Sequence, residues 1–255
     1  MVPPLKYEVP LAIAQEVYNQ QHQLVASLRT LRNILDSNIQ EARDPQSEDG
    51  GLILRMTVLS ALIHTSCALT PHETAYDAHE LSFRCIVADG EAVLVSNSAK
   101  IPSSSPKNQW HQFTMGPGVV EPLFTTACKC RHPVVRRRAI DQLSMAGREG
   151  PWYGPREARI MSRIMELEEC HDFPIDPPSA SSDIGELQRI NEVGFSSAPK
   201  ALSLSTNVIV RFSRCHSRKH RPQVHPHDDD REEFETSDNS LSGLVWERWI
   251  EQLEF

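Results

Sequence analysis

The 255-residue sequence has few glycines, no CxxC pair of cysteines and no long uncharged apolar run. Its best apolar stretch, Leu52 to Leu62, contains Arg55 and is shorter than the ~18 residues that span a bilayer. The first ten residues, MVPPLKYEVP, lack the charged and apolar regions of a secretory signal. We therefore expect a protein of the cytosol or the nucleus with no membrane partner.

The six cysteines form no recognisable metal or redox motif. Their separations of 18, 43, 2, 40 and 45 residues exclude the CxxC pairs of zinc fingers and thioredoxin-like sites. Lys129 and Arg131 could lower the pKa of the neighbouring thiols of Cys128 and Cys130. In a helix, however, those two side chains diverge by about 200°. We expect reduced structural thiols and no metal site.

Motifs of the common catalytic sites are also missing. The sequence has no GxSxG, no GxxxxGK[ST] and no GxGxxG that opens a helix. Residues 115–118 (MGPG) carry a proline where a phosphate-binding loop needs a backbone N–H, so we interpret them as a turn. Glu168 and Glu169 are expected to be solvated, and the His- and Asp-rich string 220–230 to be a solvated linker. We predict no catalytic residue, no cofactor and no enzyme activity.

Acidic residues are concentrated at the end of the chain. The formal net charge is -8, and residues 222–255 hold ten acids and two bases, so that the preceding 221 residues are neutral with 24 of each. This balance excludes a globally basic nucleic-acid binder but leaves room for a local basic patch. Two basic runs are candidates for such a patch or for nuclear import: Lys129, Arg131, Arg136, Arg137 and Arg138, and then Arg214, Arg218, Lys219 and Arg221.

The two basic runs differ in their predicted surroundings. The first lies in predicted helices with an apolar opposite face, and we expect its side chains to be solvated or ion-paired. The second lies in a segment without hydrophobic periodicity, and it is the better candidate for a nuclear-import signal.

Hydrophobic periodicity predicts a mainly α fold. Leu24, Leu28, Leu31 and Leu35 recur at helical spacing and predict one long helix over residues 11–41, which Asp44-Pro45 ends. Residues 93–95 either extend a helix or form a short strand. The other predicted elements are a turn over 46–51, helices over 52–69, 72–88, about 123–131 and from Pro133 and Pro155 onwards, a loop over 96–109, and a strand over 204–212.

We expect a helical array with a small C-terminal β element and a disordered acidic linker. The predicted divisions are a helical domain over 1–173, a Pro/Ser-rich linker over 174–203, and a C-terminal part over 204–255. That C-terminal part combines the strand, a basic-then-acidic flexible segment over 213–240 and a terminal amphipathic segment.

One block of the chain carries a family pattern. Four successive elements make up the pattern: Pro122-Leu123-Phe124, Cys130-Arg131-His132-Pro133, an arginine-rich helix from Arg136 to Leu143, and Arg148-Glu149-Gly150-Pro151-Trp152 before a Glu-rich helix. Residues 113–169 thereby resemble the C-terminal regulatory region of fungal binuclear zinc-cluster transcription factors. The resemblance implies a helical regulatory domain, a nuclear location and control of transcription, often of a metabolic gene cluster. The family's six-cysteine zinc cluster is absent, so we predict no direct DNA binding by this chain.

Our preferred interpretation is a transcription regulator without its own DNA-binding cluster. Its expected partners are the transcription machinery or a partner transcription factor, and a second copy in a homodimer. Phe234, Trp246 and Trp249 stand among carboxylates, as in acidic-hydrophobic activation segments. The two tryptophans could equally dock the C-terminus on the core.

Two alternatives stay open. The chain could be the truncated product of a gene for a full DNA-binding transcription factor. It could also be a helical enzyme or ligand-binding protein of a biosynthetic cluster, although no motif supports that reading.

Overall fold

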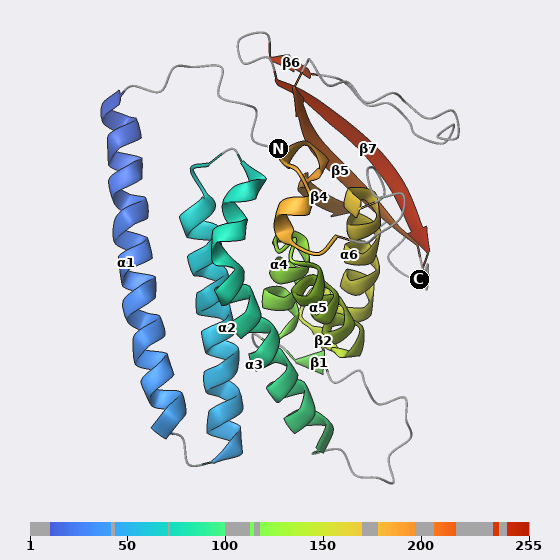
Figure 1. Cartoon of the computed structure of the whole chain (residues 1–255). Coiled ribbons are helices and arrows are strands. Elements are labelled where there is room, and N and C mark those ends of the chain that lie inside the picture. Colours follow the sequence, from blue (N-terminus) through green and yellow to red (C-terminus); the bar gives the residue numbers. More distant parts are fainter. Residues whose placement is uncertain are drawn as a thin grey trace.

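A computed structural model of the chain is mainly helical and has a small antiparallel sheet near the C-terminus (Figure 1), which confirms the predicted fold class. The described parts of the chain are residues 11–41, 44–70, 72–99, 113–114, 118–169, 178–196, 207–217, 237–239 and 244–254.

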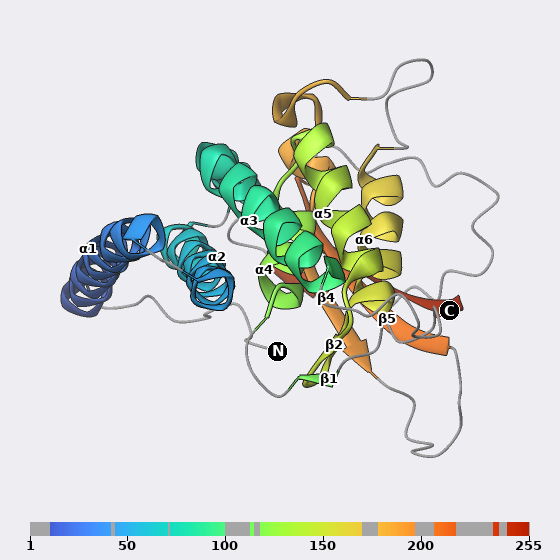
Figure 2. The ribbon, with the colours of Figure 1, turned by 90° about the horizontal axis from the view of Figure 1, so that it is seen from below.

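Three helices at the N-terminal end lie side by side, with α2 between the other two (Figures 1 and 2). Helix α1 spans Leu11–Glu41, as predicted. Helix α2 spans Pro45–Cys67, so the predicted turn over residues 46–51 is wrong. Asp44 accepts a hydrogen bond from the Ser47 backbone N–H at 2.8 Å, and Pro45 occupies the first helical position, where its missing N–H costs nothing.

The third predicted helix is divided into two elements. A 3-10 helix, η1, spans Glu73–His79, and α3 continues from it over Glu80–Ala99. Residues 93–95 therefore extend the helix, and the Val93 side chain is buried in the core. The predicted loop over 96–109 begins later than expected, because residues 96–99 are helical and 100–109 lie outside the described residues.

Arg55 explains the single charge in the apolar run of α2. Its guanidinium group donates to both carboxylate oxygens of Asp89 in α3, at 2.8 and 2.5 Å, and to Asp36 of α1 at 3.0 Å. Burial opposes the ionisation of Asp89 and raises its pKa, in spite of the opposing effect of Arg55. The three helices are thus joined by one charged group as well as by apolar packing.

The middle of the chain forms a second helical group. Its helices are α4 (Val120–Lys129), α5 (Pro133–Met145) and α6 (Gly154–Glu169). Three two-residue strands accompany them in the order β1-β2-β3: Phe113–Thr114, Arg148–Glu149 and Trp152–Tyr153. The inner face of α5 is apolar, since Val135, Ala139 and Leu143 are buried.

The C-terminal part of the chain forms a four-stranded sheet in the order β4-β5-β7-β6. All of its described pairings are antiparallel. Its strands are β4 (Ile190–Ser196), β5 (Asn207–Ser217), β6 (Ser237–Asn239) and β7 (Leu244–Glu254).

The sheet corrects two sequence-based expectations and shows the secondary structure of the terminal amphipathic segment. The predicted Pro/Ser-rich linker over 174–203 contains β4 and two single-turn 3-10 helices, η2 (Ser181–Asp183) and η3 (Glu186–Gln188). Residues 213–217, predicted to be flexible, belong to β5, which is longer than the strand predicted over 204–212; residues 218–236 lie outside the described part. The terminal amphipathic segment is a strand, β7. A four-residue spacing, as between Trp249 and Leu253, places side chains on one face of a strand as well as of a helix.

One apolar core connects the helices and the sheet. It includes Met56 and Leu59 of α2, Leu123 of α4, and Phe212 and Trp249 of the sheet. Within the described residues, the stretch Ser47–Cys67 of α2 is long and apolar enough to cross a membrane. The central helix of a helical core has the same composition, so this is weak evidence for a membrane span.

Leu123 is the clearest test of this core, because its side chain is fully buried between α4 and its neighbours. We expect Leu123→Ala to lower the free energy of unfolding by about 2–5 kcal/mol through lost transfer energy and the cavity left behind. Leu81, which is 78% exposed on α3, provides the matched control, and Leu81→Ala should change stability by less than about 0.5 kcal/mol. Urea denaturation of both variants measures this difference, and equal effects would contradict the assigned core.

Candidate functional site

The first basic run of the sequence divides between the interior and the surface. Arg131, in the α4–α5 connection, and Arg136, in the first turn of α5, have no exposed surface. Arg137 and Arg138 point outward and pair with Glu169 of α6 and Glu91 of α3. The expectation of an ion-paired face is confirmed for these outer residues, whereas the two inner arginines are fully buried.

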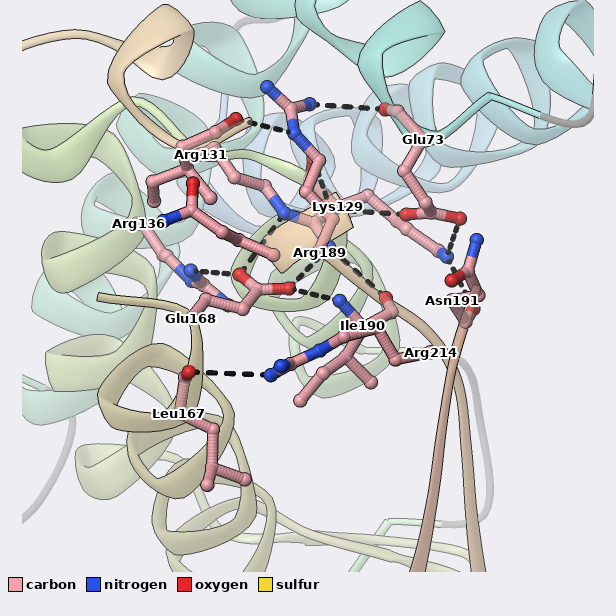
Figure 3. A network of polar contacts seen from close by, with 12 residues as sticks. Glu73, Lys129, Arg131, Arg136, Leu167, Glu168, Arg189, Ile190, Asn191 and Arg214 are labelled. Atoms are coloured by element: carbon pink, nitrogen blue, oxygen red, sulfur yellow. Dashed lines mark hydrogen bonds and ion pairs between the residues drawn. The ribbon is translucent and has the colours of Figure 1, made fainter. Parts of the chain in front are cut away.

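The inner arginines meet the carboxylate of Glu168 near the end of α6 (Figure 3). Arg131 donates to both oxygens of Glu168, at 2.7 Å from Nη2 and 3.2 Å from Nε. Arg136 donates through Nη1 to Glu168 Oε2 at 2.7 Å, and the backbone N–H of Ile190 donates to Oε1 at 2.7 Å. Glu168 has no exposed surface, so the expectation that it is solvated is wrong.

These contacts keep Glu168 ionised. Burial alone would raise the pKa of its carboxyl, but the charges of Arg131 and Arg136 and the hydrogen bonds outweigh burial and lower the pKa to about 2. A carboxylate with such a low pKa is a poor general acid or base near neutral pH. Glu168 is therefore suited to holding the fold together rather than to proton transfer.

A second layer of charge surrounds this centre. Lys129 Nζ donates to Glu73 of η1 at 2.8 Å and to the backbone carbonyl of Asn191 at 3.0 Å. Glu73 also lies 3.3 Å from Arg131 Nη1. Arg131 Nη2 donates in addition to the carbonyl of Ile190 at 3.2 Å. The start of η1, the α4–α5 connection and the start of β4 are therefore tied to the same charges.

Arg189 forms a similar junction directly before β4. Its guanidinium group donates to both oxygens of Asp77 at 2.8 and 2.7 Å, and to the carbonyls of Ile184, Glu73 and Ser181. Glu186 accepts the backbone N–H groups of Glu73 and Thr74 at the beginning of η1, at 2.7 and 2.8 Å. Segment 178–196 is thus attached to the helical body along its length, although the sequence predicted a linker there.

The second basic run is partly inside the protein. Arg214 is 4% exposed, donates to the Leu167 carbonyl at 3.4 Å, and lies 5.5 Å from the centre of the Trp249 ring. Its side chain is therefore inaccessible to an import receptor in this structure. Arg218, Lys219 and Arg221 lie outside the described residues.

The aromatic residues of the predicted activation segment have different locations. Trp249 is 3% exposed and packs against Phe212 at a ring separation of 5.4 Å, which agrees with the alternative that it docks the C-terminus on the core. Trp246 belongs to β7, where its backbone is paired with that of Cys215 in β5. The side chain of Trp246 is not among the described parts of the structure. Phe234 also lies outside the described residues.

The cysteines of the helical body behave as structural residues. Cys67, Cys128 and Cys130 are free and buried. Burial raises the pKa of the Cys128 thiol, and it raises those of Cys67 and Cys130 to about 11, so that these thiols stay protonated and unreactive near neutral pH. Among the described residues, no group of three or more His, Cys, Asp or Glu side chains could hold a metal ion.

A cluster that the sequence did not predict links α2 and α4. Thr125 Oγ1 donates to Glu121 at 3.1 Å, and it lies 3.2 Å from His64 Nε2 and 3.3 Å from Ser60 Oγ. Burial lowers the pKa of His64. A hydroxyl beside an imidazole can serve as a nucleophile, but Thr125 is only 3% exposed. We interpret the cluster as a polar connection between two helices.

Two of the elements that carry the family resemblance meet beside the first half of α4. Glu149 accepts the backbone N–H groups of Val119 and Val120 at 2.9 Å, and so caps the start of α4. Gly150 has a φ of 55°, which favours glycine, and its turn brings Trp152 to a ring separation of 5.1 Å from Phe124. The Arg-Glu-Gly-x-Trp and Pro-Leu-Phe elements are therefore parts of one packed unit.

Glu168→Gln tests the ion network. The substitution keeps the shape of the side chain but leaves the buried Arg136 charge without its counter-ion and Arg131 with Glu73 alone, so we expect it to cost about 3–5 kcal/mol of unfolding free energy. Glu166, two residues earlier on α6, is exposed and pairs with Arg163 at the surface. Glu166→Gln should change stability by less than about 1 kcal/mol. Similar losses in the two variants, measured by urea denaturation, would show that the buried network has no special role.

The low pKa of Glu168 also predicts a pH dependence. A carboxyl group whose pKa is depressed on folding stabilises the protein fully above its unfolded value of 4.5, and this contribution is lost as the pH falls toward the folded value of about 2. The stability difference between the wild-type chain and Glu168→Gln should therefore shrink as the pH falls from about 4.5 to about 2. Denaturant melts over this range measure the difference, and a constant gap would refute the assigned pKa.

Neither a protein-family model, nor a curated protein, nor a solved structure matches this chain. The resemblance to zinc-cluster regulators stays a prediction that rests on residues 113–169. What the chain does has to be argued from the packed unit, the buried charges and the acidic segment.

Proposed function

We propose that this chain is a regulatory module of transcription that acts in the nucleus through protein contacts and does not itself contact DNA. The observation that carries the proposal is the burial of Arg131 and Arg136, the two arginines of the basic run that are held by Glu168. Phosphate contacts need exposed cations, and these guanidinium groups are committed to a carboxylate in the interior. The arginine-rich helix is thereby a structural element of the body.

The packed family elements support the same proposal. Glu149, Gly150 and Trp152 each have a definite part in joining the β2–β3 turn to α4. Arg131 joins α6 to β4, and Arg136 joins α6 to α5. These residues hold the fold together and form no catalytic centre. This favours a regulatory body to which other segments of the chain add the contacts with partners.

The acidic segment is our candidate for the partner contact. It lies in the stretch of chain between β5, which ends at Ser217, and β6, which begins at Ser237, so that both of its ends are attached to the same sheet. Asp228–Asp230, Glu232, Glu233 and Glu235 surround Phe234 in the sequence. Such a mixture of charge and one large apolar group suits a coactivator groove that buries the aromatic ring. Trp249 is committed to the core. Of the other two aromatic candidates, Phe234 stands in the middle of these carboxylates, and we assign the contact to it.

Tethered transcription tests the proposal. The full chain, fused to an unrelated DNA-binding domain, should activate a reporter gene. Phe234→Ala should return the output close to background, because loss of an aromatic anchor typically costs about 2 kcal/mol or more, roughly 30-fold in affinity. Phe234→Trp keeps a large aromatic side chain and serves as the control that should retain activity.

Two results would count against the proposal. A fusion that is folded, nuclear and silent on the reporter would remove the activating role, and equal output from Phe234→Ala and the wild-type fusion would remove Phe234 from the contact. Immunoblotting of each fusion checks that expression is equal.

A further inference from the structure

Helix α1 has one covered face and one open face. It lies at the edge of the molecule, and α2 separates it from α3 and the sheet (Figures 1 and 2). Its covered face includes Leu35, which is 7% exposed, and Gln21, whose amide donates to the carbonyls of Thr65 and Ser66 at 2.7 and 3.2 Å. The outer face makes no such contacts with α2.

Beside the face that α2 covers, α1 carries an apolar stripe that is open to solvent. The stripe consists of Ile13, Val17, Leu24, Leu31 and Ile34, which are 40–57% exposed. At about 100° per residue, these five side chains fall within a sector of about 100°. Single exposed apolar residues are ordinary, but five that share one sector of a helix indicate a surface that is covered by a partner.

The spacing of the stripe indicates that the partner is another helix. Val17, Leu24 and Leu31 are seven residues apart, and this repeat keeps a seam facing a neighbouring helix along its length. The polar residues of the stripe are already satisfied within α1. Ser27 Oγ donates to the Gln23 carbonyl at 3.0 Å, and the Gln20 amide donates to Glu16 at 2.9 Å. Covering the stripe would therefore leave few polar groups without a partner.

The stripe is also nearly symmetrical about Leu24. Val17 and Leu31 lie seven residues before and after it, and Ile13 and Ile34 lie eleven before and ten after. Two copies running in opposite directions would then place Val17 of one level with Leu31 of the other, and Leu24 opposite Leu24. The five stripe residues are uncharged, and Glu16, the charged residue at the edge of the same sector, already accepts a hydrogen bond from Gln20. A self-complementary surface of this kind is what a twofold interface requires.

We propose that α1 is a dimerisation helix, whose outer stripe pairs antiparallel with the same stripe of a second copy, with Leu24 at the twofold axis. The inference rests on α1 alone and is independent of the proposed role in transcription. It assigns to the expected homodimer a definite surface, on the side of the molecule away from the sheet.

The oligomeric state of the full chain tests the proposal. Sedimentation equilibrium from about 1 to 100 µM should show a monomer–dimer equilibrium for the wild-type chain. Leu24→Glu would place two carboxylates against each other at the axis and should raise the dissociation constant at least about 100-fold. Leu81→Glu, the same change at an exposed leucine of α3, should leave the dissociation constant unchanged within about twofold.

Cysteine cross-linking tests whether the two α1 helices run antiparallel. It also tests the dimer independently if the Leu24→Glu variant folds poorly. Under mild oxidation, a mixture of Val17→Cys and Leu31→Cys chains should give the mixed covalent dimer, with the wild-type chain as the blank for native cysteines. Cross-links between two Val17→Cys chains instead would indicate a parallel pair and overturn the register.

A wild-type chain that stays monomeric at all these concentrations would overturn the proposal, and so would a dimer that Leu24→Glu leaves intact. In either case the stripe would be covered by a different partner.

Discussion

The carboxylate of Glu168 is the constraint on which the arrangement of the described chain depends. A fully buried charge is expensive to desolvate unless other charges and hydrogen bonds surround it, and Glu168 has two guanidinium groups and one backbone N–H. These groups come from the α4–α5 connection, from α5 and from the start of β4. The three segments must therefore reach the same point before the charge is compensated, and this requirement fixes the sheet against the helices.

Buried ion pairs of this kind often add little net stability compared with well-packed apolar residues. We therefore interpret the network as a means of specifying which segments meet. Arg131 binds Glu168 and the Ile190 carbonyl together, and Arg189 binds Asp77 and three carbonyls. Each contact has directional geometry that apolar packing lacks, so a different placement of β4 would leave several buried donors without acceptors.

The sequence predicted the helices well, because apolar periodicity and proline positions are local signals. The bounds of α1 follow from its repeating leucines and from Asp44-Pro45. The inward turn of Arg136 also had a local signal, since Ile140 and Leu143 lie four and seven residues later on the same face. Glu168 has a similar position, since the buried residues Ile164 and Met161 lie four and seven residues before it on the same face of α6. The missing signal was its partners, because Arg131, Arg136 and the backbone of Ile190 lie far from it in the sequence. β4 was missed for the same reason, because its strand is defined by pairing with β5.

The positions of the two candidate contact surfaces bear on how the protein would work. Helix α1 lies at one side of the molecule, and the sheet that anchors both ends of the acidic stretch lies beyond α2 and α3 (Figure 1). Pairing through α1 would therefore leave the sheet of each copy uncovered, and it would bring two acidic segments into one assembly. Two linked weak contacts bind a partner with two sites more tightly than either alone, since the second contact forms at a high effective concentration. A body held rigid by buried charge suits this use, because a fixed distance between the two segments determines which partners can engage both.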